Sequence, residues 1–198
     1  MALQREHWIS LEKYHEIERT SEIKYEYSDG RIYAMSGGTF EHSQIAINLS
    51  TILNAHLYGK MCRVANSDMK VLPLGGENPS YFPDVTVTCN PDDYQRGSTA
   101  IRSPRLIIEV LSPSTASKDR GEKLRAYQAC ASLDEYVMVS SHHQEVEVYH
   151  REGADKWTLT RYRHEQVVTL ASVDLMLPVA DIYAQTDVPP LGSILSTD

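Results

Sequence analysis

Two carboxylates inside apolar segments are the residues of this sequence best suited to do chemistry. Asp84 opens the apolar run that follows Pro83, and Glu109 lies inside the run Ile-Ile-Glu-Val-Leu. An ionised acid in such a run is costly to bury unless another group pairs with it or coordinates it. Lys123 follows on a predicted helix. Two acids and an amine suit hydrolysis with a divalent cation, in which carboxylates hold the ion and the amine meets developing negative charge.

Each of these residues also has a purely structural interpretation. An aspartate at the start of a strand is often a turn residue. Glu109 could form a buried ion pair with an arginine. Lys123 could pair with Asp119 at i, i+4, which stabilises a helix by only a few tenths of a kcal/mol. The decisive question is therefore whether the three side chains converge in the fold.

Two strands and a helix must position these groups. The sequence predicts strands over 83–89 and 105–111, and the second is apolar on both faces apart from its acid, which is typical of a central strand covered by helices. A helix is predicted over 118–131. Lys123 shares a helix face there with Tyr127, which points it toward the buried side.

A second helix, predicted over 41–57, could supply another acid. Its apolar positions are Ile45, Leu49, Ile52 and Leu53. Glu41 precedes this stripe on the same face, so we expect it to face the sheet. The alternative is that Glu41 is an acid favoured by the positive end of the helix dipole.

The remaining segments predict an α+β (or α/β) fold with a mixed sheet flanked by helices. They are a helix at 10–19, a hairpin around Asp29-Gly30, short strands at 62–64 and 69–74, strands at 135–139, 146–150 and 157–163, and a terminal helix within 173–184. The length of 198 residues predicts one domain over 1–198, with a core from about 10 to 185 and a loose C-terminal tail.

The composition indicates the class of protein, its cellular location and the state of its cysteines. Apolar residues make up 41% and charged residues 23%, as in ordinary globular proteins. No apolar run approaches the ~20 residues that span a bilayer, and the N-terminus lacks the apolar segment of a signal peptide, so we expect a cytoplasmic protein without a membrane partner. Cys62, Cys89 and Cys130 are odd in number and form no CxxC pair, so we predict neither a zinc site nor a disulfide framework, and reduced thiols.

Charge bears on nucleic-acid binding. The net charge of −8 argues against a general nucleic-acid binder, because neutralising phosphates requires lysine and arginine. The segment 95–125, however, carries seven basic and three acidic residues. It is either a local basic surface or ordinary variation in surface charge.

Four motifs together resemble a known family. PDVTV, IIEVLSPST, the helix pattern D-x-x-x-K-x-x-x-Y and DEYVMVS look like the Uma-two family of small bacterial proteins, over about Ser10 to Arg151. That family is assigned to the PD-(D/E)xK nuclease superfamily, so the resemblance implies a restriction-endonuclease-like fold. By resemblance, Asp84 and Glu109 are the two strand acids. Leu111 stands where the superfamily has lysine, and Lys123 is the position that would replace it.

The resemblance also implies a function. Glu41 best matches the superfamily's first-helix acid, with Glu26 as a rival. The expectation is a Mg²⁺- or Mn²⁺-dependent DNA endonuclease in which Asp84, Glu109 and Glu41 hold the metal and Lys123 completes the catalytic set. Cutting both strands of a duplex is easiest for a two-fold homodimer. Two alternatives stay open: a non-cleaving nuclease-fold protein that binds nucleic acid or a partner, and a hydrolase of small phosphoesters.

Overall fold

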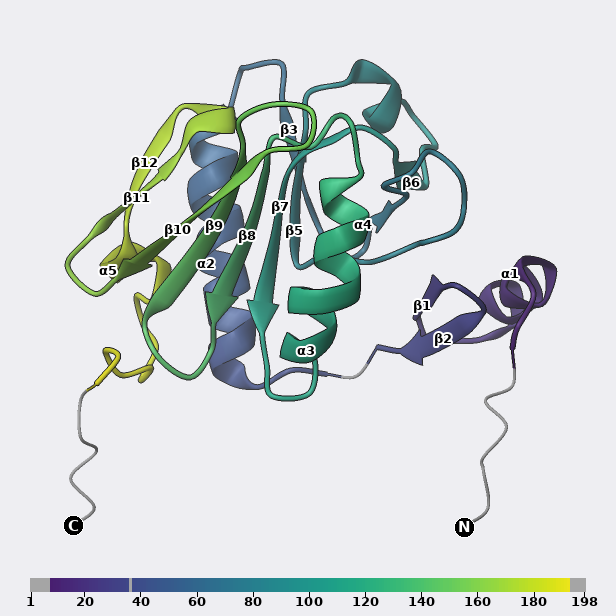
Figure 1. Cartoon of the computed structure of the whole chain (residues 1–198), viewed down its shortest axis with the longest axis horizontal. Helices are drawn as coiled ribbons and strands as arrows, with labels where there is room; N and C mark the ends of the chain where they lie inside the picture. The colour runs from purple at the N-terminus through teal and green to yellow at the C-terminus, as the bar shows by residue number, and fades with distance from the viewer. Residues whose placement is uncertain (1–7, 36, 193–198) are drawn as a thin grey trace, which may run out of the picture.

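The computed structural model describes residues 8–35 and 37–192, and at its centre lies a six-stranded mixed sheet (Figure 1). The strand order is β10-β9-β8-β7-β5-β3, with β7 and β8 parallel and the other neighbours antiparallel. The bounds are β3 (Arg63–Asn66), β5 (Val85–Thr88), β7 (Pro104–Leu111), β8 (Glu135–Ser140), β9 (Glu145–Arg151) and β10 (Trp157–Arg163). The predicted mixed sheet with a central 105–111 strand is confirmed.

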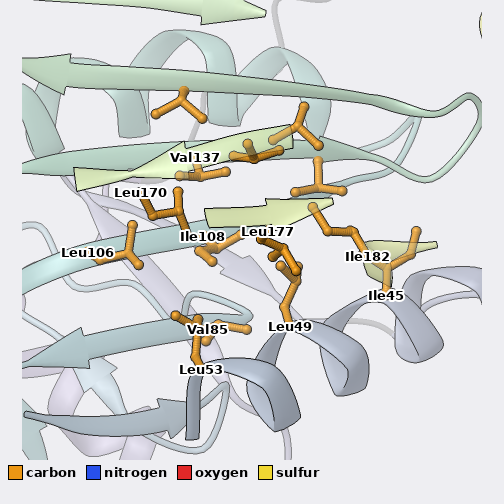
Figure 2. Close-up of a cluster of buried hydrophobic side chains, with 14 of the residues drawn as sticks. Ile45, Leu49, Leu53, Val85, Leu106, Ile108, Val137, Leu170, Leu177 and Ile182 are labelled. Carbon is orange, nitrogen blue, oxygen red and sulfur yellow. The ribbon is translucent and has the colours of Figure 1, made fainter. Parts of the chain in front are cut away.

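One face of this sheet is covered by α2 (Phe40–Leu57), whose predicted position is confirmed. Thr39 caps the helix by accepting a hydrogen bond from the His42 N–H at 3.3 Å. Successive apolar residues of α2 enter a cluster that also contains Ile108 of β7 (Figure 2). This cluster is apolar throughout and forms the larger of the two cores.

The opposite face is covered by a helix in three parts: α3 (Ala116–Lys118), the π-helical turn η2 (Asp119–Lys123) and α4 (Leu124–Gln128). In Figure 1 it lies across the sheet from α2. The helix predicted over 118–131 therefore begins two residues earlier, at Ala116, and ends at Gln128. Its middle is a π turn, which is wider than an α-helical turn. Hydrophobic spacing does not reveal a single π turn inside an otherwise α-helical pattern.

An N-terminal unit packs beside this second helix. It consists of α1 (Leu11–Thr20), capped by Ser10, and the hairpin of β1 (Tyr25–Ser28) and β2 (Arg31–Ala34). Asp29 and Gly30 both have positive φ, as a tight hairpin turn requires, so the Asp-Gly prediction is confirmed. Backbone hydrogen bonds between Tyr27 and Ser80 join the hairpin to the body of the molecule.

The C-terminal region differs from the prediction of one helix within 173–184. Strand β11 (Val167–Leu170) pairs with β12 (Leu175–Pro178), and η3 (Ala171–Val173) lies between them. Only α5 (Val179–Ile182) is helical. In β12, Met176 is exposed and Leu177 is buried, which is the alternation of a strand on a surface. Part of the predicted tail packs on the body of the molecule, since Val188 is buried and Pro189 accepts a hydrogen bond from the Gln144 N–H. Residues 193–198 of that tail lie outside the described residues.

Three short elements complete the structure. They are β4 (Lys70–Val71), its parallel partner β6 (Ala100–Ile101), and the 3₁₀ turn η1 (Pro91–Tyr94). Within the described ranges, no helix combines the length and apolarity needed to cross a membrane.

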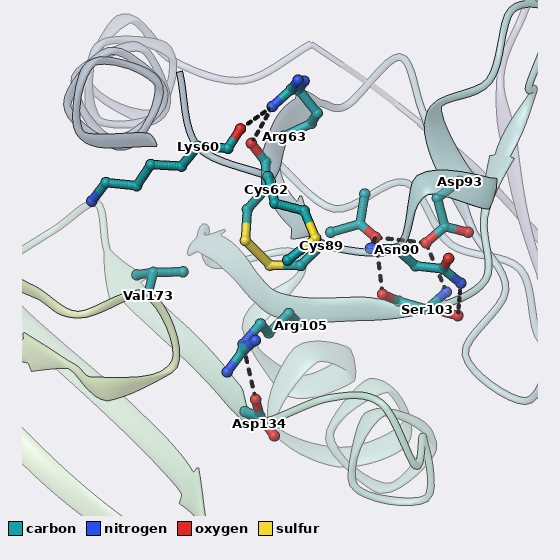
Figure 3. Close-up of a disulfide and its surroundings, with 12 residues drawn as sticks. Lys60, Cys62, Arg63, Cys89, Asn90, Asp93, Ser103, Arg105, Asp134 and Val173 are labelled. Atoms are coloured by element: carbon teal, nitrogen blue, oxygen red, sulfur yellow. Dashed lines mark hydrogen bonds and ion pairs between the residues drawn. A yellow bond between two sulfur atoms is a disulfide. The ribbon is translucent and has the colours of Figure 1, made fainter. Parts of the chain in front are cut away.

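A disulfide joins Cys62 to Cys89, so the prediction of unpaired cysteines is wrong (Figure 3). The β3–β5 register that places Arg63 opposite Thr88 brings these two cysteines together at the end of the ladder. They are 27 residues apart, and only strand pairing makes them neighbours. Cys130 is free and buried, as expected of a small core residue.

Candidate active site

Strand pairing brings Asp84 and Glu109 together. Val85 of β5 is paired with Ile108 of β7, so Asp84 stands opposite Glu109 in the antiparallel register. Val85 and Ile108 both point into the apolar cluster under α2, and alternation therefore places the two acids on the other face. Asp84 Oδ2 accepts from the Val110 N–H at 2.7 Å, which fixes this carboxylate against β7. The two predicted strands are thus neighbours, and their acids lie side by side on the sheet face opposite α2.

Lys123 reaches the same place from η2. Its Nζ lies 2.9 Å from Glu109 Oε1, 2.8 Å from Glu26 Oε1 and 3.4 Å from Asp119 Oδ1. Tyr127 also donates to Glu109 Oε1, at 3.2 Å. The three predicted residues Asp84, Glu109 and Lys123 thus converge. The buried ion pair considered for Glu109 exists as well, with lysine in place of arginine.

Glu26, the rival of Glu41 in the sequence, is the third acid of this cluster. It comes from β1, accepts from the Phe82 N–H at 3.1 Å, and pairs through Oε2 with Lys118 Nζ at 2.7 Å. It is buried and bridges the two lysines of the helix on the same sheet face.

Glu41 does not join the cluster, so the expectation that it faces the sheet beside the other acids is wrong. It lies at the start of α2, which covers the apolar face. Hydrogen bonds from its own backbone and from Thr39 hold the pKa of the Glu41 carboxyl below its usual range. This is the helix-terminus role that the sequence left open. Its neighbour His42 does approach the cluster, with Nε2 3.4 Å from Asp84 Oδ2.

The cluster opens into a cavity of about 520 Å³. The β1–β2 hairpin, the end of β7, the loop 112–115, the following helix and the start of α2 form its walls. Its charged lining consists of four acids and two lysines: Glu26, Asp84, Glu109, Asp119, Lys118 and Lys123. If all six are ionised, the cavity has an excess of two negative charges.

Burial and this charge excess shift the pKa values of the groups. Burial raises the pKa of Glu109 well above its usual range, and Lys123 only partly offsets the effect. Burial also raises the pKa of Asp119. Burial alone would lower the pKa of Lys123, but Glu109, Glu26 and Asp119 together raise it well above normal. For Glu26 the two lysines outweigh burial and lower the pKa.

These residues fit a hard divalent cation. No group of three or more His, Cys, Asp or Glu side chains in the described ranges forms a ready-made metal cage. Mg²⁺, however, is usually held by one or two carboxylates, with water and substrate phosphate completing its shell. Asp84 Oδ1 and Glu109 Oε2 have no hydrogen bond to a described residue, and Asp119 Oδ1 is buried without one. Carboxylate oxygens without a hydrogen bond suit such an ion.

The basic residues within 95–125, which the sequence left open as a local basic surface, are mostly neutralised. Four of its seven cations form ion pairs: Arg105 with Asp134, Arg120 with Glu147, Lys118 with Glu26, and Lys123 with its three acids. This segment therefore does not present a broad positive face.

Comparison with known proteins decides the family. Residues 11–180 match Uma2, which is described as "Putative restriction endonuclease". The chain belongs to the Uma2 family. The match covers both strand acids and the lysine-bearing helix, and it confirms the resemblance seen in the sequence.

Relatives of this Uma2 protein include two from Synechocystis sp. (strain PCC 6803). The protein slr1290 is 40% identical over 175 residues, which cover 88% of this chain and 91% of the relative. The protein sll1609 is 30% identical over 159 residues, covering 79% and 89%.

A solved structure shares the fold. A protein from Anabaena variabilis, titled a putative nuclease belonging to DUF820, superposes with a TM-score of 0.71 at 18% identity, over 88% of this chain and 97% of that one. The predicted nuclease-type α+β fold is thereby confirmed.

Proposed function

We propose that this protein is a divalent-metal-dependent endonuclease that hydrolyses DNA phosphodiester bonds. The observation that carries the proposal is the pairing of Asp84 with Glu109 at the base of a cavity that also holds two lysines. The Uma2 family description points to the same chemistry.

In this proposal Asp84 and Glu109 hold Mg²⁺ or Mn²⁺ through their free oxygens. The ion supplies Lewis-acid polarisation of the scissile phosphate and makes water easier to deprotonate. The Val110 N–H and Lys123 fix the orientation of the two carboxylates. Lys123 also places a fixed positive charge beside the site of reaction, where it favours the more negative transition state.

Three further aspects belong to the proposal. The substrate is DNA, although the cavity's excess of acids makes a cation a precondition for phosphate to approach. A two-fold homodimer would allow cleavage of both strands of a duplex. A cytoplasmic location is consistent with such a substrate.

The experiment is cleavage of supercoiled plasmid and of circular single-stranded DNA with Mg²⁺, Mn²⁺ or EDTA. The wild type is expected to nick or linearise DNA with either metal and to be inactive in EDTA. Asp84→Asn and Glu109→Gln should each lower the rate by about 10²–10³-fold or more. The matched control is Glu41→Gln, an acid outside the cluster, which should cleave at the wild-type rate.

A second function is favoured by one observation, the ion pairing of both cavity lysines with Glu26. A site whose cations are already neutralised suits a nuclease-fold protein that binds nucleic acid or a partner without cutting. Wild-type protein that retains DNA in a binding assay, yet leaves every DNA intact with both metals, would establish this alternative.

A further inference from the structure

The two lysines of the cavity differ in what their ammonium groups contact. Lys123 is surrounded by three carboxylates, and its side chain is 6% exposed. Lys118 has one carboxylate partner among the described residues, Glu26, and its side chain is 17% exposed. One lysine is enclosed and the other lies on the cavity wall.

The two lysines also differ in how many of their N–H groups already face an acceptor. An ammonium group has three N–H donors. Lys123 Nζ has carboxylate oxygens of Glu109, Glu26 and Asp119 within 2.8–3.4 Å, so acids enclose this ammonium group. Lys118 gives one donor to Glu26 Oε2, and its Nζ lies 3.4 Å from the centre of the Tyr33 ring. A ring face attracts a cation without providing a conventional acceptor, so it holds Lys118 in place and leaves N–H groups for another ligand.

The π turn explains why both lysines face the cavity. In an α-helix, residues five apart point about 140° away from each other. The η2 turn has i→i+5 bonding, with the Leu124 N–H donating to the Asp119 carbonyl, and it brings residues five apart into register. Lys118 and Lys123 therefore reach the two oxygens of the same Glu26 carboxylate.

We infer that Lys118 is the residue that binds a non-bridging oxygen of the scissile phosphate, whereas Lys123, whose charge lies beside the site of reaction, contacts the carboxylates of Glu109 and Glu26. This inference rests on the proposed function and identifies the substrate contact within it. On the cavity wall Lys118 follows the hydroxyl-bearing loop 112–115, which lines the same space. A phosphate entering between them would meet hydroxyl groups and one ammonium group with free donors.

The salt dependence of DNA binding tests the assignment. Each phosphate contact by a lysine contributes about 0.7 to the slope of log affinity against log salt for single strands and about 0.9 for duplexes. Binding of a fluorescein-labelled oligonucleotide, single-stranded and duplex, would be followed by anisotropy with Ca²⁺, and gels would check that it stays intact. Lys118→Met is expected to weaken binding about ten-fold and to lower the slope by one such contact. Lys118→Arg, which keeps the charge, should retain the wild-type slope.

Arg125→Met is the matched control, because it removes one exposed cation from the same helix outside the cavity. It should leave the slope unchanged. If Lys118→Met is poorly folded by circular dichroism, Lys118→Gln takes its place with the same expected slope. A folded Lys118 variant with the wild-type slope, while the wild type binds, overturns the inference and leaves the proposed function standing. A wild type that shows neither salt-dependent binding nor cleavage removes the proposed function, and this inference with it.

Discussion

Strand β7 sends Leu106, Ile108 and Val110 to one face of the sheet and Ile107, Glu109 and Leu111 to the other, and the two faces are stabilised in different ways. On the α2 face the contacts of β7 are with apolar side chains, and a buried acid of β8, Glu135, accepts hydrogen bonds from the Ala171 and Ser172 N–H groups. On the other face, apolar side chains surround a buried group of three acids and a lysine.

The difference shows how one strand can serve both stability and chemistry. The α2 face gains free energy from burial of apolar area, which does not depend on pH. The opposite face must offset the desolvation of several charges, and such clusters are weak stabilisers whose partial disruption is costly. Such a charged cluster stabilises a core less than apolar packing does. We expect it to be retained for the metal-dependent hydrolysis proposed for Asp84 and Glu109.

Removing the central cation should have the largest effect on stability. Lys123→Met leaves Glu26, Glu109 and Asp119 buried without their shared partner, so the free energy of unfolding should fall by about 3–5 kcal/mol. Urea titration measures the change. Arg125→Met should change it by less than about 0.5 kcal/mol. Equal stability of the two variants would mean that the acids are neutral or solvated.

The disulfide reinforces the apolar face, since Cys62 packs against that cluster. Reduction releases a loop of 27 residues, which in the chain-entropy model corresponds to about 3–4 kcal/mol. Urea midpoints with and without dithiothreitol give the difference. The double variant Cys62→Ser/Cys89→Ser should be insensitive to the reductant, and an unchanged wild-type midpoint would count against a structural role.

Truncating the apolar side of β7 should lower stability with less effect on the site. Ile108→Ala should lower the free energy of unfolding by about 2–5 kcal/mol, and Ile108→Val by about 0.5–1.5 kcal/mol. Metal affinity of the folded Ile108→Val variant should match the wild type. A ten-fold loss of Mn²⁺ affinity in that variant would show that the two faces are not independent.

The smallest effect is the pH dependence of stability that Glu109 should give to the face opposite α2. Burial raises the pKa of Glu109 above 4.5, so the folded state holds this proton more tightly than the unfolded state does. Its contribution to stability is present below the unfolded pKa and is lost as pH rises through the folded one. Relative to Glu109→Gln, wild type should therefore lose stability as pH rises above about 4.5. Urea titrations across pH test this, and the effect of Ile108→Val should stay constant over the same range.

The sequence was sufficient to select Asp84, Glu109 and Lys123 as candidate site residues, because each is identified by the residues around it. An acid inside an apolar run and a lysine on the buried side of a helix remain recognisable in isolation. Strand pairing was not accessible in this way, so the Cys62–Cys89 link and the β11–β12 hairpin were missed.

The choice between Glu26 and Glu41 also depended on tertiary structure. Both acids lie near apolar segments, but at the start of α2 it is His42, and not its neighbour Glu41, that lines the cavity beside Asp84. Lys118 was predicted only as the nearest substitute for Lys123, because α-helical spacing points the two lysines apart; the π turn brings both to one cavity.

Mn²⁺ binding measured by calorimetry tests the central claim most directly. We predict that wild type and Glu41→Gln bind Mn²⁺ with the same affinity, and that Asp84→Asn and Glu109→Gln each bind at least about ten-fold more weakly. Equal affinity in all four proteins would contradict the assignment of Asp84 and Glu109 as the residues that hold the metal.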